Sequence, residues 1–176
     1  MAEIIQIIGY KNSGKTTLAE YLVKFFSQKG LKVAVIKHDA HEFEMDHAGT
    51  DTWRMTQAGA AAVAISSPAR TALIEEQSSS LEELITRLGA ADLIVVEGFK
   101  QEHYPKIVML RSPEDLTLLE DCSRVIAAVC AEAVHFAKGT APEAEEQTDA
   151  VSAELPSFKR GEHQRIAEWL QEYLRV

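Results

Sequence analysis

The sequence contains few cysteines, few basic residues and no long apolar run. Two cysteines, Cys122 and Cys130, are too few for a disulfide framework or a zinc site, so we expect both to be buried apolar residues. Lysine and arginine number 18 against 27 acidic residues, and this balance argues against a nucleic-acid-binding protein. The longest apolar runs, such as residues 125–131, are far shorter than the ~20 residues that a membrane span requires, and no signal peptide is visible. These absences predict a cytoplasmic protein without membrane or nucleic-acid partners.

Short apolar runs alternate with helical patterns along most of the 176 residues. They predict buried strands at residues 4–8, 33–36, 93–96, 107–110 and 125–129. Strands that are buried on both faces and separated by helices favour a three-layer α/β fold, in which helices flank a mainly parallel sheet. Two further runs, at residues 61–65 and 71–74, flank a short turn and predict an antiparallel hairpin added to that sheet.

The remaining segments complete a single predicted domain over residues 1–176. Ser80 and Glu83 form a capping box, which predicts a helix that begins just after Ser80. An apolar stripe predicts a C-terminal helix over residues 161–175 that docks on the body of the domain. Residues 139–154 are rich in Ala, Glu, Thr and Pro without any apolar period, and they predict a mobile loop.

The residues that follow the first predicted strand match a phosphate-binding loop, G-x-x-x-x-G-K-[ST]. The backbone amides of such a loop and the N-terminus of the next helix face an anion. Lys15 is expected to reach the β- and γ-phosphates of a nucleoside triphosphate, and the Thr16 hydroxyl is expected to bind Mg²⁺. The predicted nucleotide-binding residues of the loop are Gly9, Lys11, Asn12, Ser13, Gly14, Lys15, Thr16 and Thr17.

Such a loop requires a carboxylate at the end of another strand to hold the metal ion. The apolar run at residues 93–96 ends in Glu97, and α/β sheets bind ligands at the carboxyl ends of their strands. We therefore expect Glu97 to act on the metal together with Thr16, and the Gly98 amide to face the γ-phosphate. Asp39, just after the second strand, is a further candidate for the metal or the attacking water. Lys15, Asp39 and Glu97 are thus the predicted catalytic residues.

The segment after the second strand also contains three histidines, His38, His41 and His47, among several carboxylates. One interpretation is a transition-metal site, since histidine and carboxylate are competent ligands. A second is a switch segment in which Asp39 or Asp46 acts on Mg²⁺, and a third is a solvated polar loop. The residues alone leave all three open.

Taken in order, these residues resemble the molybdopterin-guanine dinucleotide biosynthesis protein B (MobB) family. The likeness spans about residues 4–110 and is more specific than a phosphate loop, which many families share. It rests on that loop, then on Lys37-His38 with His41 and Asp46, on Gly49-Thr50-Asp51, on Ala58-Gly59-Ala60 and on Glu97-Gly98-Phe99-Lys100. The resemblance implies a P-loop GTPase that binds GTP with Mg²⁺, hydrolyses it weakly and forms homodimers. It also implies that the protein assists a guanylyltransferase, MobA, which attaches GMP to molybdopterin.

The resemblance makes Arg54 and Lys100 candidates for phosphate or pterin contact. Preference for guanine rests on the family likeness alone, because no Asn-Lys-x-Asp stretch is present; base contacts are expected near residues 130–132 and 156–158. Two other functions stay open, a P-loop small-molecule kinase and a metal-insertion GTPase. Against the kinase, the only lid-sized loop, residues 139–154, contains four glutamates, one aspartate and no arginine. Against metal insertion, the sequence has no additional cysteine or histidine motif.

Overall fold

The chain divides into two compact units. The computed structural model describes residues 2–39, 43–132 and 155–176. The first unit comprises Met1–His38 and Ile85–Val176, and the second comprises Asp39–Leu84. The hairpin, which the sequence led us to expect as an addition to the main sheet, pairs only within itself and forms a sheet of its own. The single domain expected over residues 1–176 stays a prediction.

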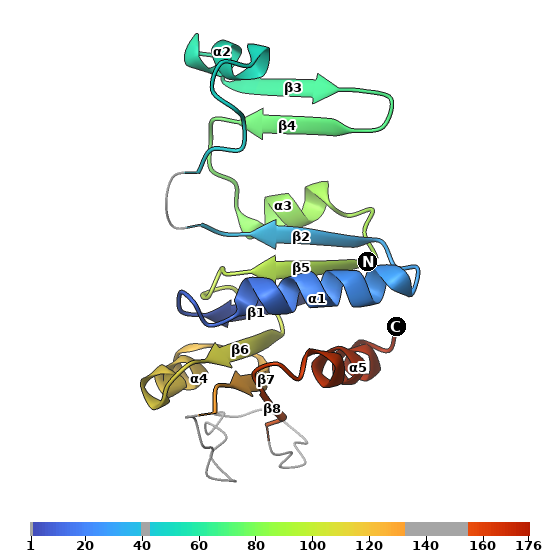
Figure 1. Ribbon diagram of the computed structural model, residues 1–176, viewed down its shortest axis with the longest axis vertical. Helices are drawn as coiled ribbons and strands as arrows, with labels where there is room; N and C mark the ends of the chain where they lie inside the picture. Colours follow the sequence, from blue (N-terminus) through green and yellow to red (C-terminus); the bar gives the residue numbers. More distant parts are fainter. Residues whose placement is uncertain (1, 40–42, 133–154) are drawn as a thin grey trace. The chain divides into compact units, whose positions relative to one another are not determined.

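The first unit contains a six-stranded sheet with helices on both faces (Figure 1). Its strands are β1 (Glu3–Gly9), β2 (Val33–Lys37), β5 (Leu93–Glu97), β6 (Lys106–Leu110), β7 (Val125–Cys130) and β8 (Ser157–Lys159). They lie in the order β2-β5-β1-β6-β7-β8, and every neighbouring pair is parallel. Its helices are α1 (Lys15–Gln28), the 3₁₀ helix η1 (Pro113–Leu116), α4 (Thr117–Asp121) and α5 (His163–Leu174). The predicted α/β fold with a mainly parallel sheet is confirmed.

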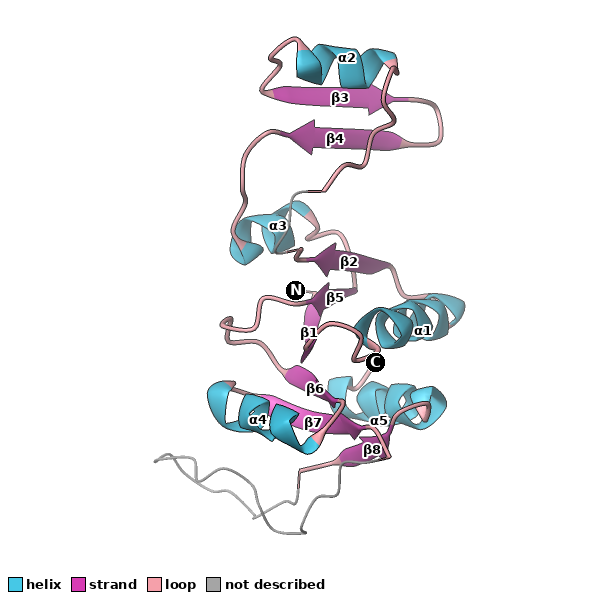
Figure 2. Cartoon of the chain, turned by 60° about the vertical axis from the view of Figure 1, so that its left-hand side comes forward, coloured by secondary structure: helices cyan, strands magenta, loops and turns pink. Residues whose placement is uncertain are grey.

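Alternate residues of a strand point to opposite faces of a sheet, and each face of this sheet has its own core. On one face, Phe26 of α1 and Leu170 of α5 belong to a buried cluster with Ile7 of β1. On the other face, Leu118 of α4 belongs to a cluster with Val108 of β6. Figure 2 shows α1 and α5 on one side of the sheet and α4 on the other. This layering leaves the carboxyl ends of the strands available for a ligand site.

The second unit contains the predicted hairpin, formed by β3 (Ala62–Ser66) and β4 (Thr71–Glu75). It also contains α2 (Asp51–Gln57) and the start of α3 (Leu81–Arg87). The Thr50 side chain caps α2 by accepting a hydrogen bond from the Trp53 N–H. At α3, the Ser80 N–H donates to Glu83 Oε2 over 2.8 Å and the Glu83 N–H donates to Ser80 Oγ over 3.2 Å. The capping box predicted from the sequence is therefore confirmed.

The C-terminal part of the chain agrees with the sequence except at one strand. The predicted C-terminal helix is confirmed as α5, but the three-residue strand β8 ahead of it is not among the sequence expectations. The loop predicted at residues 139–154 lies outside the described residues. Both cysteines are buried, as expected, and burial raises the pKa of the Cys130 thiol to about 11. In the part of the chain that the structure describes, no helix has the length and apolar character to cross a bilayer.

Candidate nucleotide site

The phosphate loop joins β1 to α1 at the carboxyl edge of the sheet. Gly9 ends β1 with a φ of 152°, and a Cβ built there would lie 2.7 Å from the Met109 carbonyl oxygen and 2.7 Å from Ser13 Oγ. Only glycine fits that space. Asn12 and Gly14 both have positive φ, at 64° and 98°, which folds the chain into a tight turn before α1 begins. The local structure is therefore the one that the sequence predicts for an anion-binding loop.

The loop and the end of β5 meet directly. The Thr16 hydroxyl lies 3.0 Å from both carboxylate oxygens of Glu97, and Glu97 is only 7% exposed. Lys37 Nζ, from the end of β2, lies 3.9 Å from Glu97 Oε1. A hydroxyl and a carboxylate oxygen are hard ligands of the kind that Mg²⁺ prefers, so this pair fits the metal expected beside a triphosphate. Thr16 and Glu97, which the sequence predicts to bind the metal together, therefore lie in direct contact.

Cationic side chains crowd around the loop. Lys15 Nζ donates to the Tyr10 carbonyl oxygen over 2.9 Å. Burial lowers the pKa of Lys15; Glu97 acts in the opposite direction, and Lys37 and Arg111 lower the pKa further. Mutual repulsion of this kind is relieved when an anion binds among the cations, so the electrostatics favour a phosphate ligand even on a chain of net charge −9.

Ser13 provides a further donor inside the loop. It is 2% exposed, and its hydroxyl has no hydrogen-bond partner among the residues that the structure describes. A buried hydroxyl without a partner is costly, and a phosphate oxygen would supply the missing acceptor. Ser13 therefore fits its predicted place among the nucleotide-binding residues.

Two arginines that sequence reasoning missed also contact the loop. Arg111 follows β6 directly, and its Nη1 donates to the Lys11 carbonyl oxygen over 3.0 Å. It is held by two further bonds to the buried Asp115, of 2.9 and 3.0 Å, and packs over the Tyr10 ring. Its place after an apolar strand is the signal that identified Glu97 and would have found Arg111 too. Arg160 follows the unpredicted strand β8, so no comparable signal was available for it.

The Arg111–Asp115 pair is held firmly as a charged pair. The Arg111 hydrogen bonds lower the pKa of the Asp115 carboxyl against the opposing effect of burial, and the same contact raises the pKa of Arg111. The Arg111 N–H also donates to Asp115 Oδ2 over 2.8 Å, so the pair fixes the chain that leaves β6. Arg111 thus holds the phosphate loop in place through the Lys11 carbonyl group.

The turn after β5 holds Gly98 against the neighbouring strand β1. The Gly98 N–H donates to the Ile7 carbonyl oxygen over 3.1 Å, and its role at a γ-phosphate stays a prediction. Positive φ at Gly98 and Phe99 turns the chain back there. The buried Gln6 amide holds the turn by donating to the carbonyl oxygens of both residues, over 3.1 and 2.9 Å. Lys100 pairs with Asp121 at 3.1 Å, and this hydrogen bond raises the pKa of Lys100. Its contact with phosphate or pterin stays a prediction.

Other predicted residues belong to the second unit. Asp39 is its first residue, and Arg54 lies on α2, where it pairs with Asp51 at 3.9 Å. Their roles at a nucleotide stay predictions. His38 ends the first stretch of the first unit, where its ring lies 4.6 Å from that of Phe99. His41 lies outside the described residues, and among those described no three His, Cys, Asp or Glu side chains gather to hold a metal.

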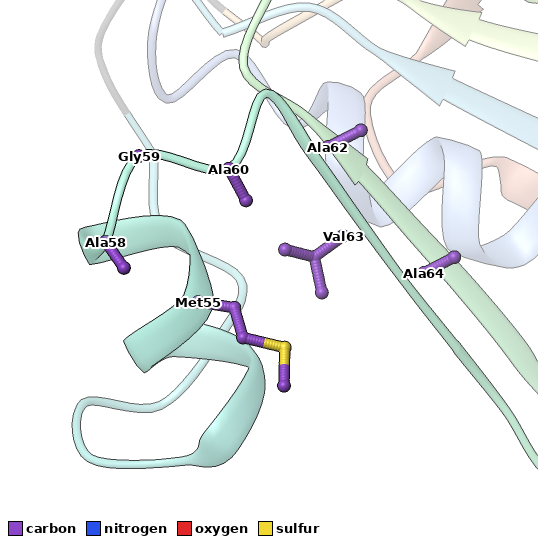
Figure 3. Close-up of a pocket in the computed structure, with 7 residues that line it drawn as sticks. All are labelled: Met55, Ala58, Gly59, Ala60, Ala62, Val63 and Ala64. Carbon is purple, nitrogen blue, oxygen red and sulfur yellow. The ribbon is translucent and has the colours of Figure 1, made fainter.

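The second unit also contains an apolar pocket of about 500 Å³ between α2 and β3 (Figure 3). Its lining residues are small or apolar: Met55, Ala58, Gly59, Ala60, Ala62, Val63 and Ala64. None of these side chains is charged or carries an N–H or O–H group that could bind a phosphate. The phosphate loop therefore remains the site suited to phosphate chemistry among the residues that the structure describes.

Comparison with known proteins agrees with this geometry. Residues 4–132 match the family model for molybdopterin guanine dinucleotide synthesis protein B, MobB. The chain is similar to a molybdopterin-guanine dinucleotide biosynthesis adapter protein of Haemophilus influenzae, with 38% identity over 128 residues that cover 70% of this chain and 72% of the relative. A protein of the same description from Escherichia coli is 33% identical over 129 residues, covering 67% and 74%.

Solved structures extend the likeness to nearly the whole chain. The crystal structure of a MobB protein homolog from Bacillus stearothermophilus has a TM-score of 0.69 and 27% identity, covering 98% of this chain and 97% of that one. The crystal structure of Bacillus subtilis MobB has a TM-score of 0.71 and 28% identity, covering 97% and 96%. The similarity therefore reaches beyond the phosphate loop to the C-terminal strand and helix.

Proposed function

The chain belongs to the MobB family, and we propose that it is an adapter protein of molybdopterin-guanine dinucleotide biosynthesis that acts by binding GTP with Mg²⁺. The observation that supports nucleotide binding most directly is the contact of the Thr16 hydroxyl with Glu97, 3.0 Å from each carboxylate oxygen, beside a complete phosphate loop. The adapter role is drawn from the descriptions of the H. influenzae and E. coli relatives.

In this proposal each group has a defined task. Lys15 exchanges its bond to the Tyr10 carbonyl oxygen for the β- and γ-phosphate oxygens, and the loop amides bind the rest of the phosphate chain. Thr16 and Glu97 hold the metal, which supplies charge neutralisation for the triphosphate when bound. Asp39 is proposed as a further contact to the metal or to the attacking water. Hydrolysis is proposed to be weak, which suits a protein whose work is done through a partner.

The proposed partners are a guanylyltransferase of the MobA type, molybdopterin, and a second copy of this chain. The second unit supports a homodimer, because its hairpin exposes large apolar side chains: Ile65 and Leu73 are each 57% exposed, on a sheet of two strands. A two-stranded sheet is marginally stable alone and has unpaired edges. Pairing of the hairpins of two copies would bury both features.

Calorimetric titration of the protein with GTP and with ATP, each with and without Mg²⁺, tests the nucleotide. We expect binding that requires Mg²⁺ for full affinity and prefers GTP. Lys15→Ala is expected to abolish this binding while the circular dichroism spectrum is unchanged, and Lys24→Ala, an exposed lysine of the same helix, is the matched control. A preference for ATP, or tight binding by folded Lys15→Ala, would contradict the proposal.

The adapter role needs a separate measurement. Purified guanylyltransferase should form the guanine dinucleotide faster when this protein is added with GTP, and Lys15→Ala should remove the stimulation while Lys24→Ala retains it. If the unsubstituted chain binds GTP but leaves the guanylyltransferase unaffected, the nucleotide assignment stands and the adapter role fails.

A further inference from the structure

Arg160 directly follows β8, and its side chain contacts the phosphate loop. Its backbone N–H donates to the Cys130 carbonyl oxygen over 2.7 Å, which fixes Arg160 at the carboxyl end of β8 beside β7. From there its side chain crosses to the loop, where Nη2 donates to the Asn12 carbonyl oxygen over 3.4 Å. A Cβ at Gly14 would lie 3.3 Å from Arg160 Nε and 3.5 Å from Nη2. The guanidinium therefore rests on Gly14, while the residue as a whole is exposed.

Arg160 and Arg111 hold neighbouring carbonyl groups of the loop, but their charges differ in availability. The Arg111 charge is paired with the buried Asp115 carboxylate. For Arg160, no salt bridge is present with any carboxylate in the part of the chain that the structure describes. The Arg111 guanidinium is therefore occupied by Asp115 and the loop. The Arg160 guanidinium can still bind a ligand through its charge and its planar face.

The position of Arg160 indicates which part of a nucleotide it would contact. Thr16, on α1 just after the phosphate loop, contacts Glu97 at the end of β5, and β5 neighbours β1. With the metal held by this pair, the γ-phosphate end of a triphosphate would point toward the β5 side of β1. The nucleoside end must then lie toward the other side of β1, where β6, β7 and β8 end. Arg160 is at the end of β8 and reaches back over the start of α1, so it lies on the path of the nucleoside. A guanidinium plane stacks well on the face of an aromatic base.

We propose that Arg160 is a nucleotide-contacting residue that stacks its guanidinium on the purine ring while tethering the loop at Asn12. This inference rests on the proposed nucleotide function and assigns a base contact to a chain that has no Asn-Lys-x-Asp stretch. It differs from the phosphate contacts of Lys15 and Ser13 because it acts on the nucleoside. Removing it should therefore weaken binding of a nucleotide more than binding of the bare phosphate chain.

The test compares GTP with inorganic tripolyphosphate, both with Mg²⁺, by calorimetry on the full chain. We expect Arg160→Ala to weaken GTP binding about tenfold more than it weakens tripolyphosphate binding, a difference of about 1.4 kcal/mol that stacking on one base can supply. Arg160→Lys keeps the charge but lacks the plane, so it should restore only part of the GTP affinity. Arg175→Ala is the matched control, because Arg175 is an exposed arginine at the C-terminal end of α5.

The outcomes separate the inference from the proposed function. Equal losses of GTP and tripolyphosphate affinity in Arg160→Ala, or no loss of either, would overturn the base contact, and so would full recovery of GTP affinity by Arg160→Lys. If the unsubstituted chain binds GTP and only the Arg160 comparison fails, this inference alone is wrong. If the unsubstituted chain binds no GTP, the proposed function fails and this inference fails with it.

Discussion

Substitution of Gly9 by alanine tests whether the phosphate loop is held by close packing. A Cβ at Gly9 would lie 2.7 Å from the Met109 carbonyl oxygen, 2.7 Å from Ser13 Oγ and 2.9 Å from Met109 Cβ. Two of these atoms belong to β6, a strand buried along its whole length, so they cannot move aside easily. The φ of 152° is also one that alanine rarely adopts.

The expected cost has two parts. Backbone strain at such a φ contributes about 1–3 kcal/mol, and forcing an extra carbon into a packed site contributes a further 1–3 kcal/mol or so. We therefore expect Gly9→Ala to lower the free energy of unfolding by about 2–6 kcal/mol, and the melting temperature by roughly 4–24 °C for a chain of this size. Gly30→Ala is the matched control: Gly30 has a φ of 90° and nothing within 4 Å of a built Cβ. It should cost only the strain, about 1–2 kcal/mol.

Urea unfolding followed by circular dichroism measures both variants, and GTP titration of the folded Gly9→Ala protein measures the loop. We expect the affinity of Gly9→Ala for GTP to fall as well, since Gly9 and Ser13 must separate. Equal destabilisation by Gly9→Ala and Gly30→Ala would refute the reasoning, because it would mean that the contacts with Met109 and Ser13 cost nothing.

Two further predictions concern charge. Glu97→Gln keeps an acceptor for the Thr16 hydroxyl but removes the negative charge, so calorimetry should show GTP affinity falling more with Mg²⁺ than without it; an equal fall would contradict a metal role. Hydrogen bonding from Arg111 lowers the pKa of Asp115, so the ionised form stabilises the fold above the unfolded-state pKa, and this stabilisation is lost as pH falls through the folded-state pKa. Asp115→Asn should therefore lower the free energy of unfolding at pH 7. The difference in this free energy between Asp115→Asn and the unsubstituted chain should shrink below about pH 4. A difference that stays constant down to about pH 2 would contradict the stabilising role of the ionised carboxylate.

Much of the first unit was predictable because its signals are local. The five predicted strands of that unit are apolar runs, and they appear within a residue or two of the expected bounds, although β2 is only partly buried. In the second unit, the capping box of Ser80 and Glu83 is equally local, because it depends on residues three apart, and it forms as expected. Thr16 and Glu97 are 81 residues apart, yet their meeting was predictable because each lies at the carboxyl end of a central strand or just beyond it.

Two sets of contacts were not predictable: those that depend on the short strand β8, and those that depend on the positive φ of Gly98 and Phe99. Arg160 reaches the loop only because β8, a strand of three residues with a single buried side chain, pairs with β7. So short a strand has no periodicity to detect. The Gly98 amide turned to Ile7 because positive φ at two successive residues reverses the chain, and Gln6 holds that reversal. Neither effect is visible in spacing or composition.

The amino-acid sequence by itself determined the phosphate loop, the acidic residue that partners it and the alternation of strands and helices, because these follow from residue type and short spacing. Tertiary structure alone decided that Arg111 and Arg160 hold neighbouring carbonyl groups of the loop and that residues 39–84 form a unit with its own sheet. The physical reason is that strand order and pairing depend on the free energy of burying whole faces against one another. That free energy is a property of the assembled chain and of no single segment.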